Sequence, residues 1–165
     1  EILKTVGDNG DLEIFFDNNQ ILFKTDDLEI ISRLIEGNYP DYQQIIPKEF
    51  VNELVIDKNE FLNSLKLANV FSGKNNDVRL KVSENKKTLE VYSANAGLGE
   101  NKYLVPIKSN GTPISISFNL KYLIDGLKSY DSEQIILGLN NNNKPSIIKS
   151  EKNSLFFYIL MPIKS

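Results

Sequence analysis

The sequence contains no cysteine, histidine or tryptophan, and the first two absences exclude whole classes of chemistry. Without cysteine there is neither a disulfide framework nor a thiolate nucleophile. Without histidine the chain lacks the commonest general base and the commonest metal ligand. No apolar run approaches the ~20 residues of a membrane helix, and no signal peptide is visible because Lys4 directly follows Ile2 and Leu3. We therefore expect an intracellular, cytoplasmic protein without a membrane partner.

Catalytic motifs are also missing. Pairs of acidic residues occur at Asp26 and Asp27 and at Asp8 and Asp11, but both pairs fall in turns, where aspartate is favoured for backbone reasons. There is no glycine-rich phosphate loop, and no glutamate follows Asp8 at the spacing of a calcium loop. We therefore expect a protein that is not an enzyme and that has no catalytic residue, metal site or cofactor.

The composition that is present is that of a globular protein, with 41% hydrophobic and 25% charged residues among 165. The net charge of -3 argues against a surface that is basic throughout. A local basic face on an acidic body would still attract nucleic acid.

Residues 31–47 contain an unusual connecting segment. An apolar strand breaks at Gly37, and the chain then passes through Pro40 and Pro47. Proline fixes its own φ and favours extended geometry in the preceding residue, so we expect 38–47 to be extended rather than helical. Large apolar side chains on this segment need a surface to lie against, which predicts a strap packed across the junction of two structural units. These side chains are Tyr39, Tyr42, Ile45 and Ile46.

Hydrophobic periodicity and capping residues predict the remaining elements. Asp57 and Asn119 are suitable N-caps for two helices. The expected helices are 1–7, 58–71 and a segment that begins after Asn119. The expected strands are 12–16, 20–24, 28–35, 53–56, 78–82, 88–92, 103–108, 114–118, 134–139, 146–149 and 155–163.

The order of these elements repeats, and so does part of the sequence. Residues 106–109 and 162–165 both read Pro-Ile-Lys-Ser, and 61–66 resemble 123–128. For residues 51–165 we therefore predict an α+β fold of two tandem β-α-β-β-β units. For residues 1–36 we predict most of a further unit of the same kind. Half of such a pair would expose Leu12, Ile14 and Phe16. We expect pairing with a second copy, disorder of 1–30, or a remainder of the protein beyond this sequence.

Several long segments resemble one known family in order and spacing. They are Ser32–Tyr42 with Ile45–Pro47; Val78–Asn85; Phe118 and Asn119 with Tyr122, Leu123 and Leu127; and Tyr158–Ile163. On these residues the chain resembles, over its full length, the bacterial DNA polymerase III beta subunit, or sliding clamp. The resemblance implies a processivity factor that encircles duplex DNA as a head-to-tail homodimer. It would tether DNA polymerase III, the clamp loader and repair proteins in the bacterial cytoplasm, at the nucleoid.

The same resemblance implies domain boundaries and sites. Residues 1–47 would be the second half of a middle domain plus the strap, and 48–165 a complete third domain, so that the chain is a carboxy-terminal fragment. The partner-peptide cleft would comprise Pro40, Gln44, Ile45, Asn119, Tyr122, Pro145, Ile159, Leu160, Met161, Pro162 and Ile163. Lys66, Lys121 and Lys128, here called the helix lysines, would face DNA, and Val70 and Phe71 would lie at the subunit interface.

The chain departs from the family pattern in three places. Gln44 stands where many members carry arginine, Lys164 and Ser165 end the chain where arginine and leucine are frequent, and the loop 94–100 contains one acidic residue. The residues alone also allow other interpretations. The helix lysines could be an ordinary solvated face, and at least one of Leu160 and Met161 should lie in the core because alternate strand residues face opposite sides. The alternative function is a β-rich peptide-binding module with no role on DNA.

Overall fold

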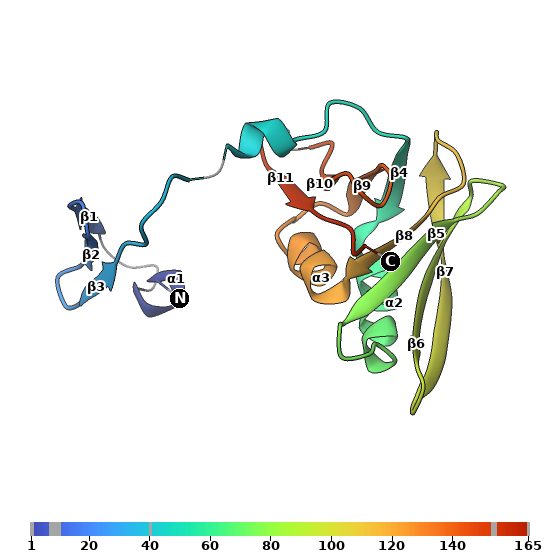
Figure 1. Ribbon diagram of the computed structural model, residues 1–165, viewed down its shortest axis with the longest axis horizontal. Helices are drawn as coiled ribbons and strands as arrows, with labels where there is room; N and C mark the ends of the chain where they lie inside the picture. The colour runs from blue at the N-terminus through green and yellow to red at the C-terminus, as the bar shows by residue number, and fades with distance from the viewer. Residues whose placement is uncertain (1, 7–10, 40, 153–154, 165) are drawn as a thin grey trace. The chain divides into compact units, whose positions relative to one another are not determined.

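A computed structural model describes residues 2–6, 11–39, 41–152 and 155–164. The chain divides into two compact units, Glu1–Asp41 and Tyr42–Ser165 (Figure 1). The smaller unit contains α1 (Ile2–Val6) and an antiparallel sheet of β1 (Glu13–Phe16), β2 (Gln20–Lys24) and β3 (Glu29–Arg33). The predicted strands are confirmed, with slightly shorter bounds for the first and third. The predicted stop of the first helix, Gly7, lies outside the described residues.

The turn between β1 and β2 is held by Asp17. Its carboxylate accepts hydrogen bonds from the backbone N–H groups of Asn19 at 2.7 Å and Gln20 at 2.8 Å. These bonds stabilise the charged form and lower the pKa of Asp17. Within this unit Ile14 is 52% exposed and Phe16 is 78% exposed, so the expected exposure of apolar side chains on the first strand is confirmed.

The strap differs from the expected extended segment. Tyr42–Ile45 form a 3-10 helix, labelled η1, and the N–H of Ile46 donates to the carbonyl of Gln43 at 3.4 Å. The two prolines restrict themselves and the residues before them, which leaves the residues between free to form one tight turn. Within the larger unit Ile46 is half-buried, while Tyr42 is 48% and Ile45 51% exposed. The packing of the strap across a junction of two units stays a prediction.

The larger unit repeats one order of elements twice, which confirms the predicted tandem. The first repeat is β4 (Asn52–Asp57), α2 (Lys58–Val70), β5 (Asp77–Val82), β6 (Thr88–Asn95) and β7 (Gly99–Ser109). The second is β8 (Ser115–Asn119), α3 (Leu120–Lys128), β9 (Gln134–Leu139), β10 (Ser146–Lys149) and β11 (Phe157–Leu160).

The two repeats exchange strand contacts. The strand order is β11-β10-β9-β4-β7-β6-β5-β8, with every neighbouring pair antiparallel. Thus β4 of the first repeat pairs with β9 of the second, and β8 of the second pairs with β5 of the first. Strand β7 pairs with two different neighbours along its length. Residues 99–106 pair with β6, and residues 107–109 pair with β4. The repeats therefore form one domain.

Strand bounds deviate from the predictions at two places for identifiable reasons. The paired strands of the β6–β7 hairpin extend to Asn95 and Gly99. The small and polar residues of this segment suggest a loop, but its backbone continues the ladder of pairs between β6 and β7. Strand β11 ends at Leu160 instead of residue 163. Pro162 has no N–H to donate, so it cannot continue the ladder.

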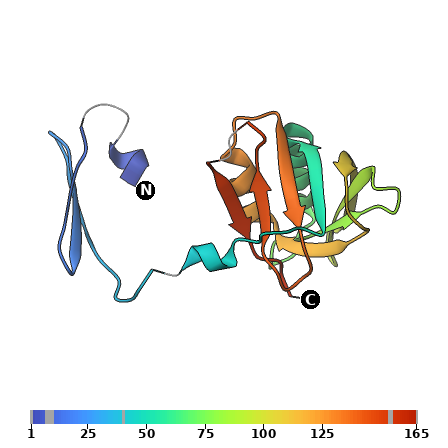
Figure 2. The same cartoon turned by 90° about the horizontal axis from the view of Figure 1, so that it is seen from above.

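Helices α2 and α3 pack against one face of the curved sheets (Figures 1 and 2). Both predicted N-caps are confirmed: Asp57 accepts from the N–H of Glu60 at 2.8 Å, and Asn119 accepts from that of Lys121 at 3.0 Å. Both helices turn apolar side chains toward the sheets: Phe61 on α2 and Leu123 on α3 are fully buried, and Leu62 and Ile124 are half-buried. Each fully buried side chain of this kind stabilises the fold by roughly 1.5–3 kcal/mol.

Candidate peptide-binding groove

An open groove of about 610 Å³ lies within the larger unit, between the end of the strap, the β9–β10 turn and the segment after β11. The strap lines it with Gln44, Ile45, Ile46, Pro47, Lys48 and Glu49; the turn with Asn140, Lys144 and Pro145; and the final segment with Met161. The groove thus brings together four of the residues that the sequence resemblance assigned to a cleft: Gln44, Ile45, Pro145 and Met161.

The end of the strap is fixed against β9 by the backbone and by one buried side chain. The N–H of Val51 donates to the carbonyl of Leu139 at 3.0 Å and also to the Asn140 side-chain oxygen at 3.2 Å. The side-chain amide of Asn140 donates in turn to the carbonyl of Pro145 at 3.4 Å. Asn140 is 5% exposed, so it joins Val51, between the strap and β4, to the β9–β10 turn from inside the domain.

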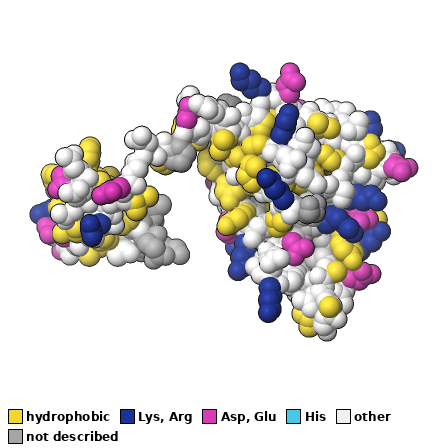
Figure 3. All heavy atoms as spheres, in the orientation of Figure 1, with side chains coloured by type: hydrophobic (Ala, Val, Ile, Leu, Met, Phe, Trp, Pro, Cys, Tyr) yellow, Lys and Arg dark blue, Asp and Glu magenta, His cyan; other side chains and the backbone are white. Residues whose placement is uncertain are grey.

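The groove combines exposed apolar side chains with exposed polar and charged ones, which are Gln44, Lys48, Glu49 and Lys144. Ile45 is 51% exposed and Met161 is 52% exposed, while Pro145 is half-buried. Figure 3 shows yellow hydrophobic atoms beside dark-blue cationic side chains in the region where η1 approaches β10 and β11 in Figure 1. Exposed apolar anchors with a few polar neighbours are typical of sites that bind short peptides.

The other described residues assigned to the cleft do not line the groove. Leu160 is 5% exposed and belongs to the hydrophobic core, and Pro162 is also buried. Ile159 and Ile163 are half-buried. The N–H of Ile163 donates to the carbonyl of Ser117 at 2.8 Å, so the end of the chain reaches β8. Pro40 lies outside the described residues.

Asn119 and Tyr122 lie at the start of α3. The Asn119 side chain is occupied, because it caps the helix and donates to the carbonyl of Asn75 at 3.4 Å. Tyr122 is 58% exposed and close to Tyr158 on β11. Burial raises the pKa of Tyr158, and the negative charge of Asp125 and the ionised form of Tyr122 add to the rise. Tyr122, Asp125 and Tyr158 therefore form an aromatic and acidic cluster on the side of α3 toward β11.

The helix lysines are exposed on the two helices. Lys66 lies on α2 and Lys121 and Lys128 on α3, and within the described part of the chain none of them is in an ion pair. Asp125 is an exposed acid on the same helix as two of them. The helices thus present mobile cationic groups that could contact phosphates without reading bases.

Val70 and Phe71 end α2 as part of a larger apolar patch. Val70 is 60% exposed, Phe71 is half-buried, and Leu67 one turn earlier is 49% exposed. Leu98 in the β6–β7 turn is 64% exposed, beside Gly99, which lies close to the Phe71 ring. The sequence interpretation missed Leu67 and Leu98. Their apolar character at a helix end and a hairpin tip is the signal that could have found them.

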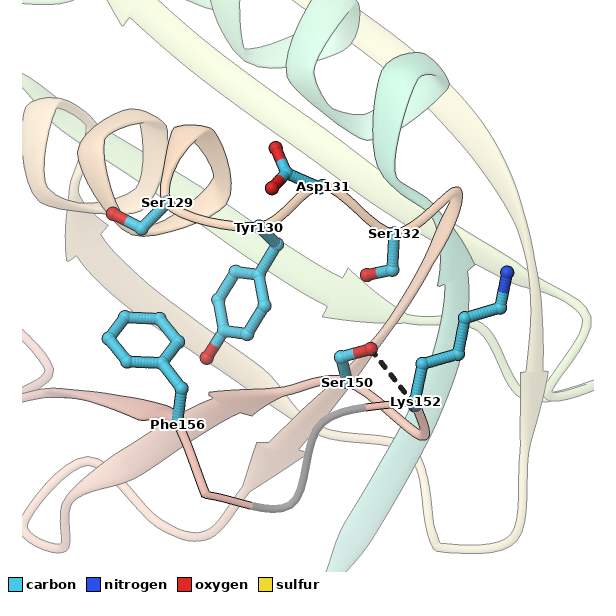
Figure 4. A pocket seen from close by; sticks show the side chains of 7 residues that line it. All are labelled: Ser129, Tyr130, Asp131, Ser132, Ser150, Lys152 and Phe156. Atoms are coloured by element: carbon cyan, nitrogen blue, oxygen red, sulfur yellow. Dashed lines mark hydrogen bonds between the residues drawn. The ribbon is translucent and has the colours of Figure 1, made fainter.

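A second, more polar pocket of about 280 Å³ lies at the other end of the β9–β10 pair (Figure 4). Its wall includes Tyr130, whose hydroxyl donates to the carbonyl of Ile148 and whose ring lies 5.0 Å from that of Phe156. Burial raises the pKa of Tyr130 to about 12. The backbone N–H of Lys152 donates to the Ser150 hydroxyl at 3.2 Å, drawn as a dashed line in Figure 4. None of the residues predicted for a site lines this pocket.

Six groove residues lie outside the cleft predicted from the sequence: Ile46, Pro47, Lys48, Glu49, Asn140 and Lys144. They lie in turns and connections, so no periodicity marks them. Within the described residues no cluster of acidic side chains suited to a metal ion occurs. No helix in the described part of the chain is long and apolar enough to cross a membrane.

Comparison with known proteins relates this geometry to one group. The family model described as "DNA polymerase III beta subunit, C-terminal domain" matches residues 43–164. The beta sliding clamp of Staphylococcus aureus (strain Mu50) is 32% identical over 167 aligned residues, which cover 100% of this chain and 44% of that protein. The chain thus spans less than half the length of this relative.

Solved structures show the same fold. The DNA polymerase sliding clamp from Bacillus subtilis matches with a TM-score of 0.80 and 26% identity, covering 93% of this chain and 41% of that one. The DNA polymerase III beta subunit from Thermotoga maritima matches with a TM-score of 0.78 and 27% identity, covering 93% and 42%.

Proposed function

The chain belongs to the DNA polymerase III beta subunit family, and from this membership we propose that it is the carboxy-terminal part of a sliding clamp. Such a clamp is a processivity factor rather than an enzyme. It would encircle duplex DNA in the cytoplasm and hold a replicative polymerase and other partners on it. The observation that carries the proposal is the groove, in which the strap, the β9–β10 turn and Met161 meet.

The groove would receive short peptides from a polymerase, a clamp loader or repair proteins. Ile45 and Met161 are exposed although each is a large apolar side chain. Burying the exposed half of each under a peptide side chain would remove apolar area from water, which favours binding. The neighbouring Leu160 and Pro162 are buried, and they would support the groove without touching the peptide themselves.

The smaller unit would be the last part of a middle domain. Its order α1-β1-β2-β3 matches α2-β5-β6-β7 and α3-β9-β10-β11 of the larger unit. In the larger unit, β5 and β9, the strands that follow the helices, each pair with a strand of the other repeat. By analogy β1 would pair with a strand that this chain does not supply, and the exposure of Ile14 and Phe16 supports that assignment.

Two further surfaces complete the proposal. The helix lysines would contact the phosphates of duplex DNA without sequence preference, as a protein that slides along DNA requires. The patch of Leu67, Val70, Phe71 and Leu98 would form the subunit contact of a homodimer. The single acidic residue of the loop, Glu100, accepts a hydrogen bond from the Tyr92 hydroxyl at 2.7 Å, so this contact would be mainly apolar.

Peptide binding tests the groove directly. A fluorescent peptide that ends in a Leu-Phe pair is titrated against the chain and against Met161→Ala, with anisotropy as the readout. Removing the exposed Met161 side chain should weaken binding by about 5- to 50-fold, or roughly 1–2.3 kcal/mol, the range of an anchor residue. Leu155→Ala is the matched control, because Leu155 is 94% exposed and does not line the groove. Equal loss in both variants, or no loss in either, would overturn the assignment.

A further inference from the structure

We propose that Met161 is a reversible oxidation site, and that its sulfoxide lowers the affinity of the chain for a partner peptide. The inference rests on the proposed peptide-binding function and concerns how that function is regulated. Its basis is the sulfur content of the sequence together with the place of the one methionine in the fold.

The thioether of Met161 is the only sulfur group among the 165 residues. The sequence contains one methionine and no cysteine, and it also lacks tryptophan. Thiolates and thioethers are the side-chain groups that mild oxidants modify most readily. An oxidant that reaches this chain therefore has a single sulfur target.

The Met161 side chain is accessible to a small oxidant. It is 52% exposed, whereas Leu160 before it and Pro162 after it are both buried. The N–H of Ile163 donates to the carbonyl of Ser117 at 2.8 Å, which holds the backbone beyond this position. Moving the thioether into the core would require a buried neighbour to leave it, so the sulfur stays on the solvent side.

The chemical step is a two-electron oxidation with a peroxide as the oxidant. A sulfur lone pair of Met161 attacks one oxygen of hydrogen peroxide, and the S–O bond forms as the O–O bond breaks. After proton transfer the second oxygen leaves as water. In the reverse step a methionine sulfoxide reductase takes up the oxygen as water, while two of its thiols are oxidised to a disulfide.

The product should change peptide binding more than it changes the domain. A sulfoxide is polar, whereas the thioether is an apolar and adaptable contact surface. Water can solvate the added oxygen in the free chain, because Met161 is half-exposed and the core side chain is the adjacent Leu160. The apolar anchors of a bound peptide would cover that oxygen without offering it a donor.

The expected size follows from this loss of solvation. Covering a polar oxygen without a hydrogen bond should weaken peptide binding by about 5- to 50-fold. The urea midpoint of unfolding should stay almost unchanged, because the modified side chain is not part of the hydrophobic core.

The test compares the 165-residue chain before and after treatment with hydrogen peroxide. The peroxide is removed with catalase before a fluorescent, sulfur-free peptide that ends in a Leu-Phe pair is added. Mass spectrometry should find one added oxygen, located at Met161, and anisotropy should show the loss of affinity. The two methionine sulfoxide reductases, one for each epimer, should restore both the mass and the affinity.

Two variants make the test specific. Met161→Leu keeps an apolar side chain but has no sulfur, so whatever its own affinity, peroxide should not alter it. Leu155→Ala keeps Met161 and changes an exposed side chain that does not line the groove, so peroxide should weaken its binding as in the unaltered chain.

Each result bears on one claim. A sulfoxide at Met161 with unchanged affinity overturns the regulatory role and leaves the peptide groove intact. A loss of affinity that also occurs in Met161→Leu, or that the reductases do not restore, overturns it as well, because damage elsewhere would be the cause. No sulfoxide under conditions that oxidise free methionine in the same tube overturns the oxidation site. If the untreated chain binds no peptide, the proposed groove function fails together with the inference.

Discussion

Replacing Asn140 by alanine should loosen the groove more than it destabilises the domain. Asn140 connects Val51, which lies between the strap and β4, to the β9–β10 turn through one accepted and one donated hydrogen bond. The substitution removes both, but the N–H of Val51 keeps its bond to the carbonyl of Leu139 at 3.0 Å. Only the Pro145 carbonyl loses its partner, in a bond that is already long at 3.4 Å, and Pro145 is half-buried.

The magnitude follows from these two bonds. One lost hydrogen bond and one reduced to a single acceptor correspond to a loss of about 1–2 kcal/mol in the free energy of unfolding. The effect on binding is separate. A strap end and a turn that are no longer joined must be ordered when a peptide binds, and an ordering cost of about 1 kcal/mol would weaken the affinity about fivefold.

Urea unfolding followed by circular dichroism and peptide anisotropy measure these two quantities on the same protein. Asn85→Ala is a matched control, because the Asn85 side chain also has two hydrogen-bond partners, Ser83 and Lys87, but in the exposed β5–β6 turn. A loss of stability above about 3 kcal/mol would show that Leu139 does not compensate as argued. Peptide affinity equal to that of the control would refute the claim that Asn140 holds the groove.

Three further predictions concern the rest of the molecule. Asn52 is fully buried, and its side chain donates to the Thr112 carbonyl at 2.7 Å and accepts from the Ser109 hydroxyl at 3.2 Å. Asn52→Ala should therefore lower the free energy of unfolding, measured in urea, by about 2–4 kcal/mol. A loss below about 1 kcal/mol would contradict the importance of these hydrogen bonds. Burial raises the pKa of Tyr130 to about 12, above that of an unfolded tyrosine near 10. The unfolded chain therefore loses the Tyr130 proton first. The contribution of Tyr130 to stability should be constant below about pH 9 and should be lost as the pH rises from 10 toward 12. Tyr130→Phe should reduce that loss, and an unchanged pH profile would argue against the assignment. Alanine at all of the helix lysines in the full-length protein should weaken the salt dependence of duplex binding, measured by anisotropy. The slope of log K against log salt should become less negative by about 0.9 for each phosphate that is no longer neutralised. A slope that does not change would exclude these lysines from the DNA-binding surface, and no salt dependence before substitution would favour a peptide-binding module without a DNA role.

The local elements of this fold follow from short-range chemistry, which is why they can be predicted. Asp57 and Asn119 cap helices because a side-chain oxygen two or three residues before a free N–H is favourable wherever it occurs. The alternation of Val78, Leu80 and Val82 predicts one buried strand face, and all three side chains are buried. The repeat of Pro-Ile-Lys-Ser indicates the tandem directly.

Long-range pairing and the groove rim are harder to predict. The pairing of β4 with β9 joins residues about eighty positions apart, and no local pattern specifies it. The 3-10 turn at Tyr42–Ile45 is not specified by the two prolines, which restrict only themselves and the residues before them. In the run of asparagines from 140 to 143, the first is buried and the others are partly or fully exposed. Composition identifies that run as a loop but cannot show which side chain faces inward.

The hydrogen bond from Ile163 to Ser117 has a mechanical consequence. Met161 lines the groove, β11 before it pairs with β10, and Ile163 after it is bonded to β8 at 2.8 Å. If a partner pulled on a peptide in the groove, the force would act on the segment from β11 to Ile163. This segment is held by β10 on one side and by β8 on the other, and β11 and β8 are the two end strands of the strand order. The force would divide between the two edges instead of peeling a terminal strand from one edge, bond by bond. The domain is therefore built to resist a sustained load at the site where a partner would be attached.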